Sequence, residues 1–247
     1  MNIVIAGGAG FVGKSLLTTW VKKNPKYSFL IIDTAVDEST NDVFSSRRVM
    51  VETQDIRSKR IIQERITEFK PDIIINAVDA SRDQDFLETH LAAAENLLEV
   101  AKATGVQQYI HLSCGEVYGS FDPSEIDTHA HRLLNEYDAM LPGSPQQASK
   151  AAADLLTWSY YQRYSLPVTI LRSAYLFGPY QTPQRLVPLM ITHAIKNQTF
   201  PVPGSSSDLR DLLHVDDFVS AIETVMDNNE AIGQIYNVSA GVRNRIK

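Results

Sequence analysis

The chain of 247 residues contains a single cysteine, Cys114. One thiol excludes a disulfide framework and a multi-cysteine metal site, and it is typical of a reducing compartment. No apolar run approaches the ~20 residues that a membrane-spanning helix needs. Because a strand-like run begins at Asn2, there is also no room for a signal peptide. We therefore expect a cytoplasmic protein that has no membrane partner.

Positive charge is in short supply, since 23 Lys and Arg residues stand against 29 Asp and Glu, a formal net charge of −6. An acidic chain suits neither the phosphates of nucleic acid nor an anionic membrane surface, so we expect no nucleic-acid partner. No spacing of His, Cys, Asp and Glu suggests a metal site. Apolar residues make up 44% of the chain, enough for one large α/β domain or one domain with a small appendage.

Glycine is concentrated near the start, between a short apolar run and residues that repeat with helical period. The segment reads Gly7-Gly8-Ala9-Gly10-Phe11-Val12-Gly13. In a strand–turn–helix unit, Gly7 allows the tight turn, Gly10 lets the backbone approach a pyrophosphate, and Gly13 lets the helix pack close to the strand. Phe11 and Val12 open the helix, whose free N–H groups suit phosphate. The pattern predicts a dinucleotide site; the alternative is a tight turn that binds nothing.

Asp33 follows the apolar run 29–32 and lies twenty residues past Gly13. A carboxylate at this place can accept both ribose hydroxyls of an adenosine and would repel a 2′-phosphate. No Arg or Lys lies between Asp33 and Phe44 to receive such a phosphate. The spacing therefore favours NAD over NADP, and the alternative is an ordinary residue at the end of a strand.

Strand-like runs alternate with helical patterns along the rest of the chain, which predicts βαβ units and a parallel sheet. The expected fold class is α/β, a doubly wound parallel sheet. Polar stretches at 37–46 and 120–143 are expected to be surface loops. Strands are expected at 48–51, 72–77, 108–113, 168–171, 212–215 and 234–238, and helices at 61–69, 83–104, 145–164, 184–196 and 217–226.

A set of short motifs extends over essentially the whole chain. They are Asp55-Ile56-Arg57, Ser113 with Glu116-Val117-Tyr118-Gly119, Ser144-Pro145 with Ala148-Ser149-Lys150-Ala151, Gly178-Pro179-Tyr180-Gln181, Arg210-Asp211 and Tyr236-Asn237-Val238. With the glycine motif they make the chain resemble the extended short-chain dehydrogenases/reductases, an NAD-dependent epimerase/dehydratase family with a Rossmann-type fold. The dTDP-glucose 4,6-dehydratases are the most similar members, followed by the nucleotide-sugar epimerases. The dehydratases oxidise C4 of the sugar, eliminate water across C5–C6 and return hydride to C6.

The resemblance implies roles for individual residues. In the cofactor site, Asp55 and Ile56 would hold the adenine, and Lys150 would bind the nicotinamide ribose. Glu116 would take the C5 proton of the sugar. Further implied cofactor-binding residues are Ala77, Val78 and Ser113, and the implied substrate-binding residues are Arg185, Leu186, Pro201, Arg210 and Asn237.

Other interpretations of these residues stay open. Asp55 could be a solvated loop acid, and Lys150 an ordinary lysine on a helix face. Arg210 could pair with Asp208 or Asp211 at the surface. Two histidines inside strand patterns are interpreted as core residues: His111 and His214.

The chain departs from the family at the expected reaction centre. Gln146 stands where the Tyr-x-x-x-Lys motif has its tyrosine, and an amide cannot act as a base. Gly115 replaces the family's acidic aspartate. Cys114 replaces a threonine, and it could titrate if Lys150 lowered its pKa; the alternative is an inert, half-buried thiol. Since a positioned acid or base contributes ~10²–10⁴ in rate, turnover should be impaired. Two further departures are Asp79-Ala80-Ser81 and Tyr175-Leu176.

Two hypotheses follow, both with NAD as cofactor and a dTDP- or UDP-hexose as ligand. One is an NAD-dependent nucleotide-sugar dehydratase or epimerase with impaired chemistry; the other is a non-catalytic binding protein, a sensor or partner. Residues 1–172 would form the NAD-binding domain, with 211–228 packing on it. Residues 173–210 and 229–247 would form a substrate lobe shortened relative to the family. A homodimer through the helices 83–104 and 145–164 is also expected.

Overall fold

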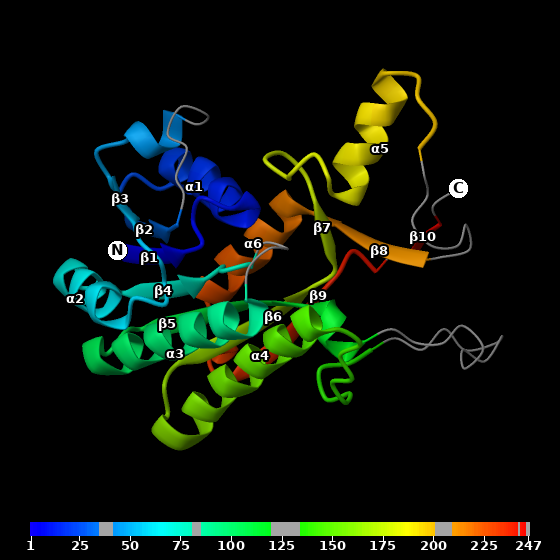
Figure 1. Cartoon of the computed structure of the whole chain (residues 1–247). Coiled ribbons are helices and arrows are strands. Elements are labelled where there is room, and N and C mark those ends of the chain that lie inside the picture. The colour runs from blue at the N-terminus through cyan, green and yellow to red at the C-terminus, as the bar shows by residue number, and fades with distance from the viewer. Residues whose placement is uncertain (35–41, 81–84, 120–133, 201–208, 242, 246–247) are drawn as a thin grey trace.

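The computed structural model describes residues 1–34, 42–80, 85–119, 134–200, 209–241 and 243–245. Seven parallel strands form its large sheet (Figure 1). In spatial order they are β3 (Val49–Thr53), β2 (Ser28–Asp33), β1 (Asn2–Ala6), β4 (Ile73–Asn76), β5 (Gln108–Cys114), β6 (Val168–Ser173) and β9 (Gln234–Val238). The order reverses direction between β1 and β4, so a crevice opens there at the carboxyl ends of the strands.

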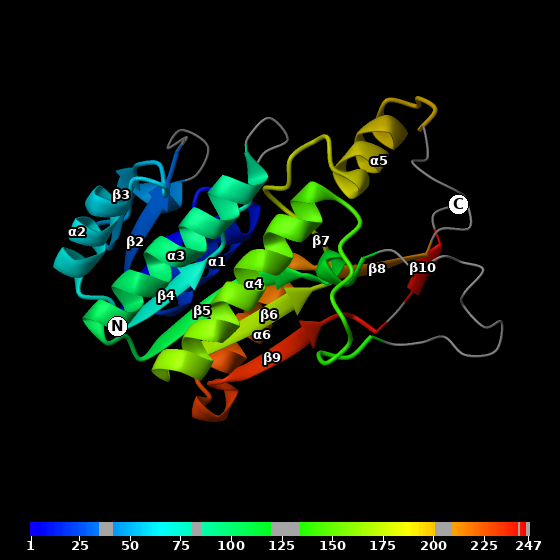
Figure 2. The ribbon, with the colours of Figure 1, turned by 60° about the horizontal axis from the view of Figure 1, so that its bottom comes forward.

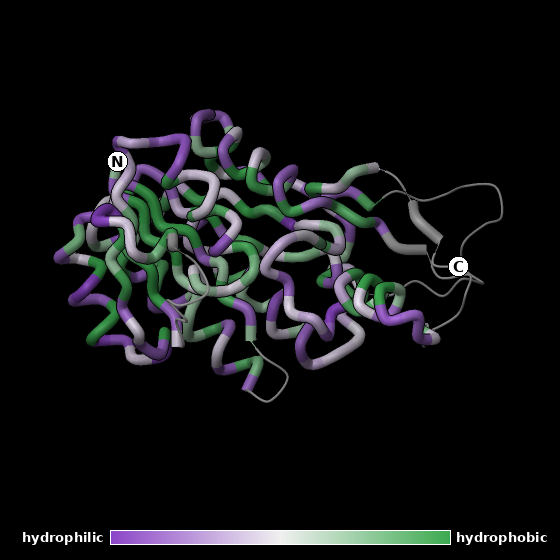
Figure 3. Tube along the Cα trace, turned by 90° about the horizontal axis from the view of Figure 1, so that it is seen from above, coloured by the Kyte–Doolittle hydropathy of each residue, from purple (hydrophilic) through white to green (hydrophobic). Residues whose placement is uncertain are grey.

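Helices cover both faces of this sheet (Figure 2). On one face lie α1 (Phe11–Lys23) and α6 (Val215–Met226), and on the other lie α2 (Lys59–Phe69), α3 (Phe86–Thr104) and α4 (Pro145–Tyr164). Strands β1, β2, β4 and β6 are buried on both faces, so their sequences are rich in apolar residues, whereas the edge strands β3 and β9 are partly exposed. In Figure 3 the hydrophobic segments, coloured green, gather in the interior of the molecule. The predicted doubly wound α/β fold is confirmed.

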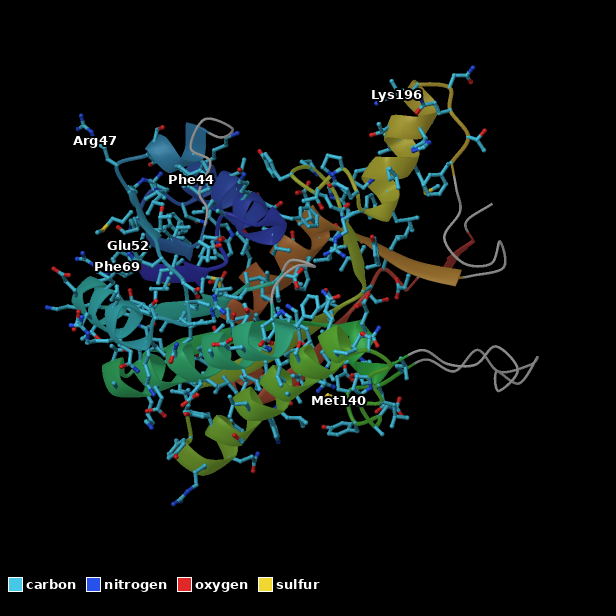
Figure 4. The ribbon with its side chains drawn as sticks, viewed as in Figure 1. Phe44, Arg47, Glu52, Phe69, Met140 and Lys196 are labelled. Atoms are coloured by element: carbon cyan, nitrogen blue, oxygen red, sulfur yellow. The ribbon has the colours of Figure 1, made fainter. Side chains whose placement is uncertain are left out.

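A smaller sheet of three strands lies beyond the carboxyl end of the large one. Its members are β7 (Tyr175–Phe177), β8 (Leu209–His214) and β10 (Arg243–Arg245). β8 runs parallel to β7 and antiparallel to β10. The helix α5 (Leu186–Ile195) stands out from the body here, with Lys196 at its far end (Figure 4). β9, which the predicted division places in the C-terminal lobe, pairs instead with β6 in the large sheet.

The best predicted elements are those with strong local signals. Helix α4 spans the predicted residues because Ser144 caps it, accepting a hydrogen bond from the backbone N–H of Gln147 at 3.2 Å, and because Pro145 occupies the first turn. Gly105 ends α3 in the left-handed conformation, with φ of 66°. Strand β9 also matches its predicted bounds.

Three local predictions are wrong. The expected loop 37–46 contains a 3-10 helix, η2 (Asp42–Ser45), because Val43 and Phe44 are buried in the core; residues 37–41 lie outside the described chain. Helix α6 starts earlier than expected, since His214 caps it by accepting from the N–H of Asp216. His214 is therefore a half-exposed cap and not a core residue.

Strands β7 and β10 were not predicted, nor were the 3-10 helices η3 (Gly115–Tyr118) and η4 (Asn229–Ala231). Within the described residues, no helix combines the length and apolar character needed to cross a bilayer.

Candidate functional site

The glycine turn brings the ends of β1 and β4 unusually close together. Gly7 has φ of +76°, and a Cβ built on it would lie 2.5 Å from the carbonyl oxygen of Ala77. A Cβ on Gly13 would lie 2.4 Å from Cα of Gly8, so Gly13 lets α1 pack closely against the backbone that follows β1. Gly10 is the N-cap residue of α1. No side chain at these positions fills the space in front of the first helical N–H groups, those of Phe11 and Val12.

Asp33 braces this turn from the end of β2. Its Oδ2 accepts a hydrogen bond from the N–H of Ala9 at 3.0 Å, and its Oδ1 accepts from the N–H of Thr34 at 2.8 Å. The carboxylate is therefore oriented beside the glycine turn while the residue stays partly exposed. This placement is the one that a ribose ligand needs.

Asp55 lies after β3 and is paired with Arg57. The guanidinium approaches the two carboxylate oxygens at 2.6 to 3.0 Å, and the hydrogen bonds from Arg57 hold the pKa of Asp55 below its usual value. Ile56 is buried between them, and its carbonyl accepts from the side-chain amide of Asn96 at 2.8 Å. The carboxylate is thus held in one orientation and is not a freely solvated loop acid.

Lys150 reaches from α4 to the end of β4. Its Nζ donates to the carbonyl of Val78 at 2.9 Å and lies 3.4 Å from Oδ1 of Asp79. Only 13% of the side chain is exposed, so the interpretation as an ordinary lysine on a helix face is wrong. The neighbouring residue Ala77 donates its N–H to the carbonyl of Ala6, which keeps this loop against the glycine turn. The structure therefore brings Lys150, Val78 and the turn into one site.

Asp79 is the centre of this part of the site, although no role was predicted for it. Its carboxylate faces Lys150, Arg185 at 3.6 Å and His90 at 3.7 Å. Burial raises the pKa of Asp79, but the positive charges of Lys150 and Arg185 outweigh that effect and hold the pKa well below its usual range. Its position just after a buried strand was the signal that could have pointed to it.

His90 was also missed, and it connects this loop to the start of α4. Its Nε2 accepts from the N–H of Ala80 at 3.1 Å, so its Nδ1 carries the proton and donates to Oγ of Ser149 at 2.7 Å. Ser149 in turn donates to the carbonyl of Gln146. Burial lowers the pKa of His90, which is consistent with the neutral form that this chain of hydrogen bonds requires.

The expected reaction centre lies where β5 ends. Burial raises the pKa of Cys114 to about 11; Lys150 acts in the opposite direction, but burial dominates. Of the two interpretations of Cys114, this burial favours the inert thiol over the activated one. Glu116 is exposed in η3, where a substrate could reach it. A Cβ on Gly115 would lie 3.4 Å from the carbonyl of Ser173, so the position has room for a side chain.

Two polar groups at this end of the sheet have no partner among the described residues. Ser113 is buried at the penultimate position of β5, and its Oγ makes no hydrogen bond there. His111 is buried as predicted, and burial lowers its pKa to about 4. Its Nδ1 faces the side-chain amide of Asn76, while its Nε2 is unpartnered.

A buried ion pair supports the reaction centre from below. Arg172 donates two hydrogen bonds of 2.9 Å to Asp154, and the exposed fraction of each side chain is 1%. Arg172 also donates to the hydroxyl of Tyr118 at 2.8 Å, and this hydroxyl donates to Oδ1 of Asn237 at 2.8 Å. The amide of Asn237 donates further to the carbonyl of Leu134. Asn237 therefore ties β9 to η3, and its predicted contact with substrate stays a prediction.

The other predicted substrate residues are separated in the structure. Arg185 is the N-cap residue of α5, and the N–H of Leu186 donates to the hydroxyl of Tyr175 at 3.3 Å. Arg210 lies on β8 opposite Asn244, but its side chain is outside the described part of the structure. Pro201 also lies outside the described residues. Of this group, Arg185 alone is placed next to Lys150, through Asp79.

The sequence and the fold of this chain are similar to those of known proteins. Residues 3–239 match the NAD dependent epimerase/dehydratase family. The chain belongs to that family. It is 32% identical to the dTDP-glucose 4,6-dehydratase of Salmonella typhimurium over 260 residues, covering 96% of this chain and 72% of the relative. It is 29% identical to the low-salt glycan biosynthesis protein Agl12 of Haloferax volcanii, covering 98% of this chain and 78% of that protein.

Solved structures of epimerase/dehydratase family members share the fold. The dTDP-glucose 4,6-dehydratase of Bacillus anthracis, in complex with NAD, is 28% identical with a TM-score of 0.89, and the match covers 99% of this chain and 77% of that one. The dehydratase of Streptomyces venezuelae, also with NAD bound, is 28% identical with a TM-score of 0.87, and the match covers 99% and 77% of the two chains. The family is NAD-dependent, and its NAD-binding members have this fold.

Proposed function

We propose that this protein binds NAD and a nucleoside-diphosphate hexose in a dehydratase-type site, and that its turnover is impaired at the proton-transfer steps. The observation that carries the proposal is the contrast within one site. The glycine turn, Asp33 and Lys150 are arranged for a dinucleotide, while Gln146 and Gly115 stand at the acid–base positions.

The residues present fit NAD. Glycine at positions 7 and 13 lets the turn lie against Ala77 and α1 lie against Gly8, and Gly10 carries no side chain at the start of α1, where a pyrophosphate would bind. Asp33 would receive the adenosine ribose, and Lys150 the nicotinamide ribose. Bound NAD would supply a hydride acceptor and donor, so the cofactor would end each cycle unchanged. Asp55, Ile56, Ala77, Val78 and Ser113 complete the proposed cofactor site.

The residues at the sugar end would bind the substrate but move protons poorly. Arg185 and Arg210 supply positive charge suited to a diphosphate. Glu116 is an exposed carboxylate that could take a proton from carbon. No phenol stands at position 146 to remove the O4 proton, and a thiol of pKa about 11 at Cys114 is a poor substitute. Without that first oxidation, Glu116 has no acidified C5–H to attack.

The first experiment asks whether the purified protein carries NAD, by acid extraction and an enzymatic NAD assay. We expect uptake of NAD at micromolar to millimolar concentration, and failure to bind NAD at millimolar concentration would refute the proposal. The second experiment incubates the protein with dTDP-glucose and NAD and follows the 4-keto product. We expect formation much slower than in a dehydratase with the Tyr and Asp present, and brisk formation would refute the impairment.

A second candidate function is supported by the same substitutions. A protein that holds NAD and a nucleotide sugar without turnover would act as a sensor or as a partner of other proteins. It would show tight binding of both ligands and no 4-keto product even after long incubation. Exchange at C4 without dehydration would instead indicate an epimerase.

We further propose a cytoplasmic homodimer. Cys114 is a free thiol, which suits a reducing compartment. Helices α3 and α4 pack side by side on one face of the sheet. Leu87 of α3 and Leu155 of α4 each have an exposed fraction of 55%. A four-helix contact between two copies would cover these side chains. Light scattering at micromolar protein tests the dimer, and Leu155→Glu should shift it toward the monomer.

A further inference from the structure

The carboxylate of Asp79 connects the cofactor side of the site to the start of α5. It faces three groups from three helices: Lys150 of α4 at 3.4 Å, Arg185 before α5 at 3.6 Å and His90 of α3 at 3.7 Å. Its two oxygens are shared, since Oδ1 faces Lys150 and Oδ2 faces Arg185. One side chain thus touches both the proposed cofactor lysine and a proposed substrate arginine.

The ion pair between Asp79 and Arg185 joins the start of α5 to the NAD-binding side. None of its ten residues is buried, although most of them are apolar, and Ile195 is 80% exposed. Its first N–H bonds to Tyr175, which belongs to the small sheet. Among the ion pairs of the described residues, the one that joins the start of α5 to the β4–α3 loop is Asp79–Arg185. This ion pair therefore links the carboxylate of Asp79 to the start of α5.

His90 does not neutralise Asp79 at neutral pH. Its Nε2 accepts a hydrogen bond from the N–H of Ala80, so the ring facing Asp79 is neutral. The single negative charge of Asp79 is then shared by two cations, Lys150 and Arg185. Lys150 is largely enclosed, with 13% exposure, whereas Arg185 is 48% exposed. The ion pair of Asp79 with Lys150 is therefore the stronger of the two, because solvent screens the pair with the more exposed Arg185.

We propose that Asp79 is a positioning residue that makes NAD and a nucleoside diphosphate bind cooperatively, by holding Lys150 and Arg185 on one carboxylate. This inference rests on the proposed function, because it assigns the two cations to the two ligands. When NAD fixes the position of Lys150, the carboxylate of Asp79 is fixed with it, and Arg185 is then held in place for the nucleoside diphosphate. The same sequence of effects runs from Arg185 to Lys150 when the nucleoside diphosphate binds first. Linkage makes the effect reciprocal, so each ligand tightens the other by the same factor.

The test measures the dissociation constant of NAD by titration calorimetry, with and without saturating dTDP. The ratio of the two constants isolates coupling, since removing a negative charge will change each single affinity by itself. We expect dTDP to tighten NAD about two- to fivefold in the native protein, the range of a partly exposed ion pair. In Asp79→Asn the ratio should fall to about one, and Asp79→Glu, which keeps the charge, should retain it. Glu64→Gln removes an exposed ion pair on α2 and should leave the ratio unchanged.

A native ratio in Asp79→Asn would overturn the proposal, as would complete loss in Asp79→Glu. Hydrogen exchange of the ligand-free protein gives an independent readout. Asp79→Asn should exchange the amides of α5 two- to fivefold faster than the native protein, with α2 unchanged, and Glu64→Gln should leave α5 unaffected. Equal exchange of α5 in Asp79→Asn and the native protein would refute the role of Asp79. If the native protein binds no NAD, the proposed function fails, and hydrogen exchange still decides whether Asp79 holds α5.

Discussion

The cofactor half of the site and its reaction centre are held in place by different means. In the cofactor half, segments of backbone pack directly against each other: Gly7 lies against Ala77, and Gly13 lies against Gly8. At the proposed reaction centre, the positions of the side chains leave the backbone contacts unchanged. Gly115 has room for a side chain, and Gln146 is partly exposed at the start of α4. We therefore expect substitutions at Gly115 and Gln146 to leave the fold unchanged, whereas a side chain at Gly7 or Gly13 would collide with backbone.

The support beneath the proposed reaction centre is intact, although Gln146 and Gly115 stand at the proposed acid–base positions. Arg172 and Asp154 form a buried bidentate pair, and Tyr118 connects them to β9. Burial alone would lower the pKa of Arg172, but the Asp154 carboxylate outweighs it and raises that pKa. We therefore expect the two halves to differ in chemistry and not in stability, and four measurements test this expectation.

The largest effect is expected from restoring the acid–base groups. The double variant Gln146→Tyr with Gly115→Asp should form the 4-keto product from dTDP-glucose at least about 10² times faster than the native protein, since one positioned group alone contributes about 10²–10⁴. Ala148→Tyr is the matched control, because it adds a phenol to an exposed position of the same helical turn. If the double variant binds both ligands and its rate stays native, these positions do not limit turnover.

Breaking the buried support should cost stability. Asp154→Asn leaves Arg172 as an uncompensated buried charge, which should lower the free energy of unfolding by about 3–5 kcal/mol. Urea denaturation measures this change. Glu64→Gln, which breaks an exposed pair, should stay within about 0.5 kcal/mol of the native value. A loss below about 1 kcal/mol in Asp154→Asn would show that this pair does not support the site.

The Cys114 thiol should react slowly. Its pKa of about 11, raised by burial from an ordinary value of 9.0, lowers the thiolate fraction at neutral pH about 100-fold. Iodoacetamide should therefore alkylate Cys114 about 100 times more slowly in the folded protein than in urea, as followed by mass spectrometry. Equal alkylation rates in the folded protein and in urea would show that Cys114 is reactive. The reaction centre would then retain a group able to exchange protons.

The smallest of the four effects tests the glycine turn. Gly7→Ala places a Cβ 2.5 Å from the carbonyl oxygen of Ala77 at positive φ, and it should weaken NAD binding about tenfold or more. Gly105→Ala is matched in φ, at +66°, but its Cβ would meet nothing within 4 Å. It should cost about 1–2 kcal/mol of stability and leave NAD affinity unchanged. Calorimetric titration of both variants decides the comparison.

The predictions that succeeded rest on neighbouring residues. Ser144 and Pro145 start α4, and Gly105 ends α3, because capping is settled within one helical turn. The start of α6 was misplaced because His214 and Asp216 are both able to cap a helix, and packing selected the first. Asp79 was missed because its partners come from three helices that are distant in the sequence.

The amino-acid sequence by itself determined the glycine turn, the acidic residue at the end of the second strand and the absence of a phenol at position 146. Each of these is a property of residue type at a fixed local spacing. Only the tertiary structure decided that the surroundings of Cys114 raise its pKa and that Asp79 joins Lys150 to Arg185. Burial and charge at a point depend on every segment packed around it, and those segments meet only when the chain has folded.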